Sequence, residues 1–399
     1  MSAKLLMVTE YFYPSDTSGA YYLTKIAETL SKSTNFRVIT TVSLNNKTEL
    51  HSLKDNIYRI NGTNLNKNKL ITRIFRIIIL SLKLTYKTLV VSKKGDYIIT
   101  VTDPVLFTLL LPIIKKIKKI KYTIIVWDIF PENLLAAELI KEKSFFYKIV
   151  KYLFNKLYNS ADSLIVIGRD MEDIVKKKVN NKSVSIKLIE NWCNSNSVQP
   201  MFRIENKIIK KLELEEKIIF SFVGNLGRVN GLTNLLNASS FVKNKNFVLL
   251  FIGDGAMRST IENHITLSPN SNVVYAGSFP ASEQNEFLNA CDIAVISLTS
   301  TMYGLGVPSK LYYNMSAGKP ILFIGHEKSE VNQVINDHKI GWYHKPNDPR
   351  GLAQMFDTIC TDHTIARKGE KSRKILEELY SEKYALQKYS NYFSSMIIK

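Results

Sequence analysis

The chain has 399 residues, of which 45% are hydrophobic and 11% aromatic, and its formal net charge is +19. This composition excludes a disordered chain, and the length predicts two or three domains with cores of their own. Three cysteines, Cys193, Cys291 and Cys360, lie too far apart for a disulfide framework or a CxxC metal site, so a reducing cytosol is expected.

The sequence predicts neither secretion nor a membrane-spanning segment. The apolar run 4–9 reads as a strand rather than as the apolar core of a signal peptide. The longest uncharged apolar stretch, 105–114, is shorter than the roughly 20 residues that a transmembrane helix needs. We therefore expect a cytoplasmic protein.

The positive charge is concentrated in the first half of the chain. Residues 1–200 hold 31 lysines and arginines against 16 acidic residues, whereas residues 201–399 hold 23 against 19. Between residues 65 and 122 there are 13 basic and 2 acidic residues. This half is expected to face an anionic partner, but no helix-turn-helix, zinc or RNP motif accompanies the charge, so nucleic acid is not expected.

Uniformly apolar runs, separated by helical patterns, predict parallel strands in the first half at 4–9, 37–41, 57–60, 96–100, 122–128, 163–167 and 186–189. Ligands of such sheets bind beyond the carboxyl ends of the strands. The residues of interest therefore follow strands, at 11–19, 102–104, 128–132 and 168–169. The first loop contains no GxGxxG, which weakens a dinucleotide-binding interpretation.

One basic, amphipathic helix is predicted from Leu70 to Val91, and a second basic run extends from Lys115 to Lys121. In the first helix, apolar residues recur on one side, and Arg73, Arg76, Lys83 and Lys87 share another. This pattern is typical of a helix that lies on an anionic membrane surface. The alternative is a core-facing helix whose lysines are simply solvated.

Polar residues 190–197 form the candidate linker between domains. Strands are then predicted at 218–223, 247–252, 272–276, 293–298 and 320–325, with helices after Leu232 and at 281–291, 329–337 and 348–360, and further helix up to residue 392. Four of these strands deliver glycine-containing or polar loops to one edge of the sheet. That edge is the predicted nucleotide site.

The last of these loops leads into a helix that begins near Lys310. Free backbone N–H groups at a helix N-terminus favour an anion such as phosphate, Ser309 is a candidate N-cap, and Lys310 adds a positive charge. Glycines at 304 and 306 leave room for a ligand near the main chain. An ordinary strand-to-helix turn is the alternative, because a single GxG is weak evidence.

Together these segments resemble the retaining glycosyltransferases of family 4, whose GT-B architecture has two facing Rossmann-like domains. The resemblance covers nearly the whole chain and rests on Ser18-Gly19, Glu190-Asn191-Trp192, Phe222-Val223-Gly224, Gly231-Leu232, 251–255 and 317–320. Segment 127–132 combined with 307–311 is similar to the branch that adds amino sugars or deoxysugars to bacterial surface polysaccharides.

The resemblance implies an acceptor domain at 1–198 that faces the membrane, a nucleotide-sugar-binding domain at 199–375, and a C-terminal helix at 376–399 that returns to the first domain. It implies transfer of an N-acetylhexosamine or deoxyamino sugar, with retention, from a nucleoside diphosphate sugar, taken to be UDP-linked. The acceptor would be a polyprenyl-diphosphate-linked saccharide in O-antigen, capsule or exopolysaccharide synthesis, used by an enzyme on the inner face of the cytoplasmic membrane.

The implied site has three parts. Arg228 and Lys310 would neutralise the departing diphosphate, and Asp128 would orient or deprotonate the acceptor hydroxyl, although capping of the helix after Pro131 is an equally good role for Asp128. The acceptor side would include Tyr11, Asp16 and Glu132; His51 has no assigned role. The donor would bind Gly19, Gly224, Asn225, Gly227, Gly253, Asp254, Phe279, Gly304, Leu305, Gly306, Val307, Pro308, Ser309 and Tyr313.

Two departures from the family pattern change the expected contacts. Asn230 stands where many members have a lysine, so Arg228 is expected to supply that charge. Leu305 and Tyr313 stand where many members have two glutamates, the second of which holds the ribose. The chain has no Asp-x-Asp, so no metal or other cofactor is expected.

Two other functions are compatible with the sequence. One is a nucleotide-sugar 2-epimerase on the same scaffold, which the scarcity of histidines near the predicted site disfavours. The other is a non-catalytic, membrane-surface protein with a degenerate nucleotide site, which Asn230 and Tyr313 favour. A NAD-dependent enzyme is a third and weaker alternative, because the GxGxxG motif of dinucleotide-binding domains is missing.

Overall fold

The computed structural model describes residues 4–15, 17–42, 53, 56–62, 70–268 and 272–397. The chain divides into two compact units: residues 1–135, 140–189 and 386–399 form the first, and residues 136–139 and 190–385 form the second. Apart from residues 136–139, the chain leaves the first unit after residue 189 and returns to it at residue 386, whereas the predicted limits were 198 and 375.

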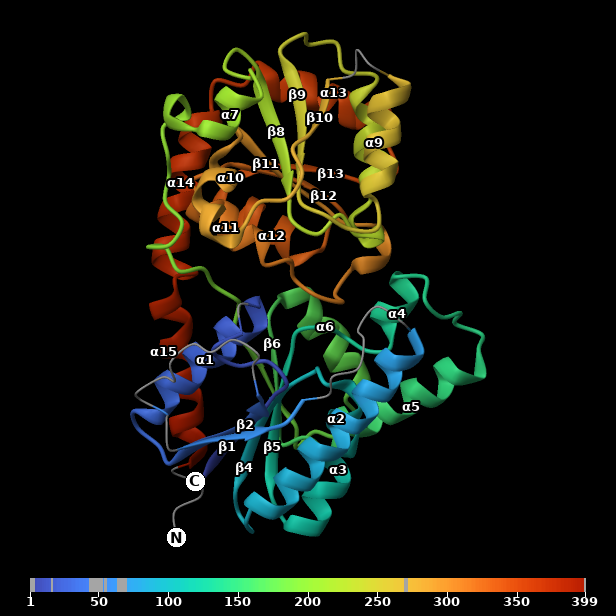
Figure 1. The fold of residues 1–399 in the computed structure, drawn as a ribbon, viewed down its shortest axis with the longest axis vertical. Helices are drawn as coiled ribbons and strands as arrows, with labels where there is room; N and C mark the ends of the chain where they lie inside the picture. Colours follow the sequence, from blue (N-terminus) through green and yellow to red (C-terminus); the bar gives the residue numbers. More distant parts are fainter. Residues whose placement is uncertain are drawn as a thin grey trace. The chain divides into compact units, whose positions relative to one another are not determined.

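The first unit is built on a seven-stranded parallel sheet in the order β3-β2-β1-β4-β5-β6-β7 (Figure 1). Its central strands consist almost entirely of buried apolar residues, which is the pattern of a sheet covered on both faces. The strands are β1 (Leu5–Val8), β2 (Phe36–Thr41), β3 (Ile57–Ile60), β4 (Tyr97–Val101), β5 (Lys121–Val126), β6 (Ser163–Val166) and β7 (Ser185–Leu188).

Helices connect these strands and cover the sheet. They are α1 (Ser18–Ser31), α2 (Leu70–Val91), α3 (Val105–Lys118), α4 (Glu132–Ala136), α5 (Phe145–Ser160), α6 (Arg169–Lys178) and the C-terminal α15 (Glu382–Ile397). The end of α15 packs on this sheet, where the Phe393 ring contacts the Tyr97 ring edge-on at 6.3 Å and the Tyr392 hydroxyl donates to Ser163 Oγ at 2.8 Å.

The second unit contains a six-stranded parallel sheet in the order β10-β9-β8-β11-β12-β13 (Figure 1). Aromatic rings fill part of its core: the centroid of the Phe356 ring, on α13, lies 4.9 Å from that of Phe220 and 4.8 Å from that of Phe247. The strands are β8 (Ile218–Val223), β9 (Phe247–Ile252), β10 (Val273–Tyr275), β11 (Ile293–Ser297), β12 (Ile321–Ile324) and β13 (Gly341–His344).

The helices of this unit include short 3-10 turns at three of the loops that follow strands. The α-helices are α7 (Lys207–Lys211), α8 (Leu232–Ser239), α9 (Arg258–Leu267), α10 (Gln284–Asn289), α11 (Lys310–Ser316), α12 (Glu330–His338), α13 (Pro349–Cys360) and α14 (Ile365–Leu379). The 3-10 turns are η2 (Arg203–Glu205), η3 (Arg228–Asn230), η4 (Ala281–Glu283) and η5 (Ser300–Met302).

The sequence predicted each strand of the described chain except β13 within a few residues. Strand β13 is four residues long, begins with glycine and lies half-buried at the sheet edge, so it lacks the apolar run that marks the others. The predicted helix 281–291 is corrected: η4 comes first, and α10 begins only at Gln284.

Candidate functional site

The loops that follow β8, β9, β10 and β11 are hydrogen-bonded into one cluster at the carboxyl edge of the second sheet. The N–H groups of Gly224 and Leu226 donate to the carbonyls of Ile252 (2.8 Å) and Asp254 (2.9 Å). Gly253 N–H donates to the Gly277 carbonyl at 2.8 Å, and Thr299 N–H donates to the Val229 carbonyl at 2.8 Å. The structure thus brings the predicted glycine loops of this half together.

Glycine is required where two of these loops touch. Gly253 has a φ of 135°, and a Cβ atom on it would lie 2.0 Å from the Gly224 carbonyl oxygen. A Cβ atom on Gly255 would lie 2.6 Å from Asn225 Oδ1. These glycines therefore have a packing role, which is to let the loops after β8 and β9 meet.

Lys310, the first residue of α11, points its amine into the protein near this cluster. Its Nζ atom is buried and has no hydrogen-bond partner among the described residues. The amine lies 3.8 Å from the centroid of the Phe222 ring, and a Cβ atom on Gly224 would lie 3.7 Å from it. Burial lowers the pKa of Lys310 to about 7.

The buried Lys310 amine contacts the Phe222 ring but has no hydrogen-bond acceptor among the described residues, so it could bind an anion. Buried charges in folded proteins are normally paired or hydrogen-bonded, because desolvation of an isolated charge is costly. The backbone N–H groups of Gly306 and Val307, just before α11, also have no acceptor within the described part of the chain. Amine and N–H groups together could bind a phosphate.

The remainder of this loop differs in part from the prediction. Leu305 and Val307 are buried. Ser309 occupies the predicted N-cap position of α11, but its side chain makes no capping hydrogen bond. The Ser309 carbonyl instead accepts the N–H of Tyr312 at 3.1 Å. Tyr313 is half-buried on the first turn of α11.

Arg228 and Asn230 lie on η3, in the loop after β8. Arg228 is exposed and makes no ion pair with the described residues. Asn230 is buried, and its Nδ2 atom donates to the Asn225 carbonyl at 2.9 Å. Asn230 therefore holds the loop in shape, whereas the Arg228 guanidinium is available to a ligand.

Two further predicted donor residues lie at the ends of neighbouring strands. Asp254 is exposed after β9, and its Oδ1 atom accepts the Gly255 N–H at 2.8 Å. Phe279, after β10, is half-buried, with its ring 6.3 Å from the Phe287 ring.

In the first unit, Gly19 lies in the first turn of α1, where Thr17 is the N-cap and accepts the Ala20 N–H at 3.2 Å. A Cβ atom on Gly19 would lie 3.1 Å from Cζ3 of Trp127, which follows β5. The observed role of Gly19 is to make room for this ring. Whether it also touches the donor stays a prediction.

Three carboxylates, Glu10, Asp103 and Asp128, follow β1, β4 and β5 at the carboxyl edge of the first sheet. Glu10 is buried and pairs with Arg76 of α2. Asp103 and Asp128 reach the surface, yet the surrounding protein removes enough water to raise the pKa of each to about 6; for Asp103, the charges of Glu10 and Asp128 add to this effect.

The sequence predicted a role for only one of these three carboxylates, Asp128. Asp103 directly follows a predicted strand, and this position is the sequence signal that could have identified it as a candidate site residue. The first turn beyond Pro131 is closed by the carbonyls of Ile129 and Pro131, and Asp128 accepts no hydrogen bond from the described residues. The alternative role of Asp128 as a helix cap is therefore wrong, whereas its catalytic role stays a prediction.

The other predicted acceptor-side residues have different environments. Tyr11 is half-buried, and its pKa is raised, mainly by burial and next by the Glu10 charge. Glu132 forms an ion pair with Lys178, whose side chain is only 8% exposed, and this pair joins α4 to α6. Glu132 thus has a structural contact. Asp16 and His51 lie outside the described residues.

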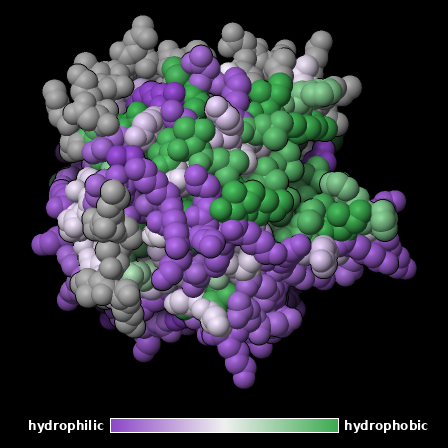
Figure 2. Space-filling view, turned by 90° about the horizontal axis from the view of Figure 1, so that it is seen from below, coloured by the Kyte–Doolittle hydropathy of each residue, from purple (hydrophilic) through white to green (hydrophobic). Residues whose placement is uncertain are grey.

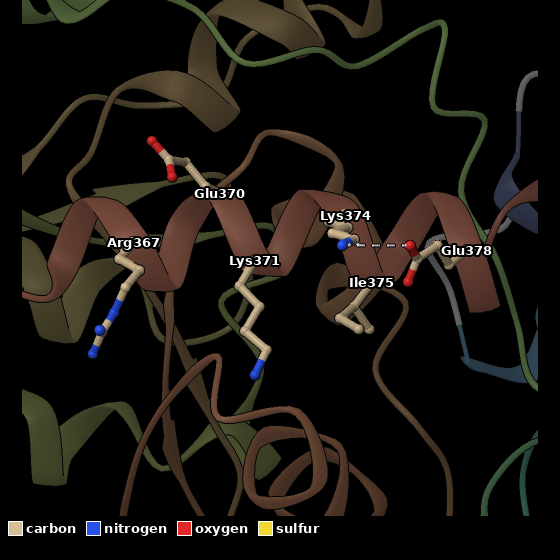
Figure 3. A pocket seen from close by; sticks show the side chains of 6 residues that line it. All are labelled: Arg367, Glu370, Lys371, Lys374, Ile375 and Glu378. Atoms are coloured by element: carbon tan, nitrogen blue, oxygen red, sulfur yellow. Dashed lines mark ion pairs between the residues drawn. The ribbon is translucent and has the colours of Figure 1, made fainter.

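A pocket on α14 is separate from these residues. It is lined by Arg367, Glu370, Lys371, Lys374, Ile375 and Glu378 (Figure 3). The Lys374 amine pairs with Glu378 at 3.9 Å, and both side chains are more than half exposed. The pocket contains none of the predicted site residues, and its charges of both signs do not favour a particular ligand.

Comparison with known proteins agrees with this arrangement. Residues 204–378 match the family described as glycosyl transferases group 1. The chain is 35% identical over 393 residues to the probable glycosyltransferase WbjE of Pseudomonas aeruginosa, covering 97% of each chain. It is also 24% identical over 183 residues to the O-antigen chain mannosyltransferase C of Escherichia coli, covering 45% of this chain and 47% of that protein.

Among solved structures, the Anabaena protein Alr3699/HepE in complex with UDP and glucose superposes with a TM-score of 0.70 at 15% identity, covering 98% of this chain and 100% of that one. At this identity the likeness establishes the fold alone, two parallel-sheet α/β units of the GT-B type. On the strength of its full-length relative and its family match, the chain belongs to the group 1 glycosyltransferases and is an enzyme of that class.

Proposed function

We propose that this glycosyltransferase belongs to family 4 and transfers an N-acetylhexosamine or deoxyamino sugar from a UDP-linked donor to a lipid-linked saccharide, with retention of configuration. Binding of UDP and glucose by the Anabaena protein of the same fold supports the choice of nucleotide. The O-antigen mannosyltransferase among the relatives supports a role in bacterial surface polysaccharide synthesis.

The observation that carries this proposal is the Lys310 amine, buried beside Gly224 without a hydrogen-bond partner. A donor diphosphate bound here would provide the anionic hydrogen-bond acceptor that the amine lacks. Arg228, exposed on the loop after β8, would meet the same diphosphate from η3. With two fixed cations in these positions, charge stabilisation would need no metal ion.

In the proposed reaction, the bond between the anomeric carbon and the diphosphate oxygen breaks, and a bond forms between that carbon and an acceptor hydroxyl oxygen. Lys310 and Arg228 stabilise the charge that grows on the leaving diphosphate. Asp128, ionised above pH 6, orients the acceptor hydroxyl, whose proton passes to this carboxylate or to the departing diphosphate. Attack from the face that the diphosphate leaves would retain the configuration.

Ribose recognition would differ from that in the many family members that have two glutamates here. Tyr313 and Leu305 stand at the two glutamate positions, and Leu305 is buried. The exposed carboxylate of Asp254 could therefore hold the ribose, with Phe279 near the base.

A lipid-linked acceptor would require contact with the inner face of the cytoplasmic membrane. None of the described helices is long and apolar enough to cross a bilayer, so this contact would be peripheral. We assign it to α2 and to the run from Lys115 to Lys121. Exposed apolar side chains on α2 support the assignment: Ile74, Phe75, Ile78, Leu82, Tyr86 and Val90.

The charge on α2 is less available than the sequence predicted. Arg76 pairs with Glu10, Lys83 donates to the Asn61 carbonyl at 3.0 Å, and Lys87 lies 4.9 Å from the centroid of the Tyr58 ring. Lys115 of α3 also pairs with Asp162, at 2.7 Å. These basic residues largely serve the fold, so α2 contributes mainly apolar surface to the proposed contact.

A screen of nucleotide sugars for UDP or GDP release, run with lipid-linked acceptor extracts, tests the proposal. We expect UDP release that depends on the acceptor, together with binding of UDP in a calorimetric titration. Conversion of the donor to an epimer without any acceptor would replace transfer by epimerisation. Failure to bind any nucleotide would mean that the site is degenerate.

A further inference from the structure

Helix α5 has a second apolar face that the fold does not cover. Its inner face is complete, because Tyr147, Phe154, Leu157 and Tyr158 are buried and the Phe154 ring stacks on Phe130 at 5.2 Å. On its outer side, large apolar residues recur at helical spacing and remain exposed: Phe145 (78%), Phe146 (60%), Ile149 (42%), Tyr152 (65%) and Leu153 (38%). An outer helix face of a water-soluble α/β unit is normally polar.

This outer face continues onto the neighbouring helices. Helix α3 packs against both α2 and α5, and it exposes Ile113 and Ile117. Figure 2 shows the resulting broad hydrophobic surface, in green, on the face seen from below. Contiguous apolar surfaces of this kind mark binding sites for proteins or membranes rather than ordinary surface.

The charges on these helices favour an anionic occupant. None of α2, α3 and α5 contains an aspartate or a glutamate, and each contains lysines. Arg76, Lys83 and Lys87 of α2 are engaged in contacts within the fold. On α5, Lys148 and Lys156 are exposed, and the exposed Lys151 lies 5.5 Å from the centroid of the Tyr147 ring. Lys116 of α3 is also exposed. Among the described side chains, the positive charge that is available to a partner therefore lies mainly on α5 and α3.

We propose that α5 is a membrane-docking helix that lies in the plane of an anionic lipid surface. Phe145, Phe146 and Tyr152 enter the boundary between headgroups and acyl chains, and lysines of the same helix contact lipid phosphates. The inference rests on the proposed function, because a lipid-linked acceptor places the enzyme at such a surface. A second copy of this chain fits less well, because a two-fold contact through this face would oppose lysines to lysines.

The apolar part of the proposal is tested with the full-length double variant Phe145→Ser/Phe146→Ser. We expect its partition coefficient on vesicles that contain phosphatidylglycerol to fall by about tenfold or more, because two exposed rings no longer enter the lipid. The matched control is Phe202→Ser, which removes an equally exposed ring (77%) from the second unit and should bind vesicles like wild type. Equal binding by the double variant and wild type would overturn the proposal.

The charge part is tested with Lys148→Gln/Lys151→Gln/Lys156→Gln. Each lost lysine should weaken binding to anionic vesicles by about fivefold at low salt. Added salt should reduce the difference in affinity between the variant and wild type. The triple variant Lys207→Gln/Lys210→Gln/Lys211→Gln on α7 has the same net charge and exposed lysines in the second unit, so it is the control. If both triple variants lose equal affinity, binding depends on net charge and not on α5.

Titration with UDP separates this inference from the proposed function. The Phe145→Ser/Phe146→Ser protein should bind UDP like wild type, which also shows that it is folded. Wild-type protein that binds vesicles through α5 but no nucleotide would leave the inference standing and remove the proposed function. If the wild type forms dimers that the double variant cannot form, and neither binds vesicles, the occupant is a second copy and the inference fails.

Discussion

At the scale of single residues, the buried amine of Lys310 links stability to function. Without an anion it is a desolvated charge with no hydrogen-bond partner, and burial lowers its pKa to about 7. Such a group destabilises the folded chain, and it is retained where it binds a ligand. Its position in the sequence, at a helix start after a glycine loop, could be predicted. Its burial could not, because that depends on Phe222 and Gly224, which are almost 90 residues away.

The variant Lys310→Met keeps the length of the side chain and removes its charge. We expect turnover to fall by roughly ten- to a thousandfold, because the leaving diphosphate loses a cation, while the thermal unfolding midpoint rises. Kinetic assays and calorimetry measure the two effects. Lys374→Met on the exposed face of α14 is the control and should change neither. Loss of both stability and turnover would indicate a purely structural role for Lys310.

The pKa of Lys310 also predicts how donor binding depends on pH. Below pH 7 the amine is charged, and as the pH rises through 7 it loses the charge that attracts the diphosphate. UDP affinity should therefore weaken between pH 7 and 9 in the wild type and stay nearly constant in Lys310→Met. Calorimetric titrations across this range measure the difference, and identical pH profiles for the two proteins would contradict the assignment.

The raised pKa of Asp128 predicts how the stability of the folded chain depends on pH. The pKa of Asp128 is about 6 in the folded chain and roughly 3.9 in the unfolded chain, so ionisation of this carboxyl destabilises the folded state. The full loss of stability is present above pH 6, and there is no loss below about pH 4. Asp128→Asn should therefore abolish most transfer and raise the unfolding midpoint at pH 8, and this gain should shrink as the pH falls towards 4. A gain in stability that does not vary with pH would have another cause.

At the scale of elements, apolar runs predicted nearly every strand. The periodicity of apolar residues did not predict which face of a helix is buried or which of its charged side chains form ion pairs. Helix α2 was correctly bounded, yet Arg76 on its basic side turned out to pair with the buried Glu10. Helix α5 was not singled out, because its inner and outer faces are both apolar and the sequence does not tell which one the sheet covers. Tertiary contacts decide both cases.

The contact between two glycine loops gives a prediction about element packing. In Gly253→Ala, the new Cβ atom would meet the Gly224 carbonyl at 2.0 Å, so we expect a loss of stability on the order of 3 kcal/mol. Gly277→Ala is the control, because its φ is also positive (78°) but its Cβ would have open space, and about 1 kcal/mol is expected there. Equal losses of unfolding free energy would show that φ alone requires glycine at 253.

At the scale of the whole molecule, two parallel-sheet units divide the proposed work. The second unit presents the glycine loops with Lys310 and Arg228, and the first presents the carboxylate edge and the apolar helix faces. The fold could be predicted from alternating strands and helices together with a family resemblance. The sugar and the acceptor could not, because the motifs that carry the resemblance are specific to the family and not to one sugar or one acceptor.

The central claim is that the donor diphosphate binds the Lys310 amine, and a crystal structure of the protein with UDP tests it most directly. We predict a phosphate oxygen within hydrogen-bond distance of Lys310 Nζ, with the backbone N–H groups of Gly306 and Val307 donating to the same diphosphate. A diphosphate bound elsewhere, with the Lys310 amine still buried and unpartnered, would contradict the claim.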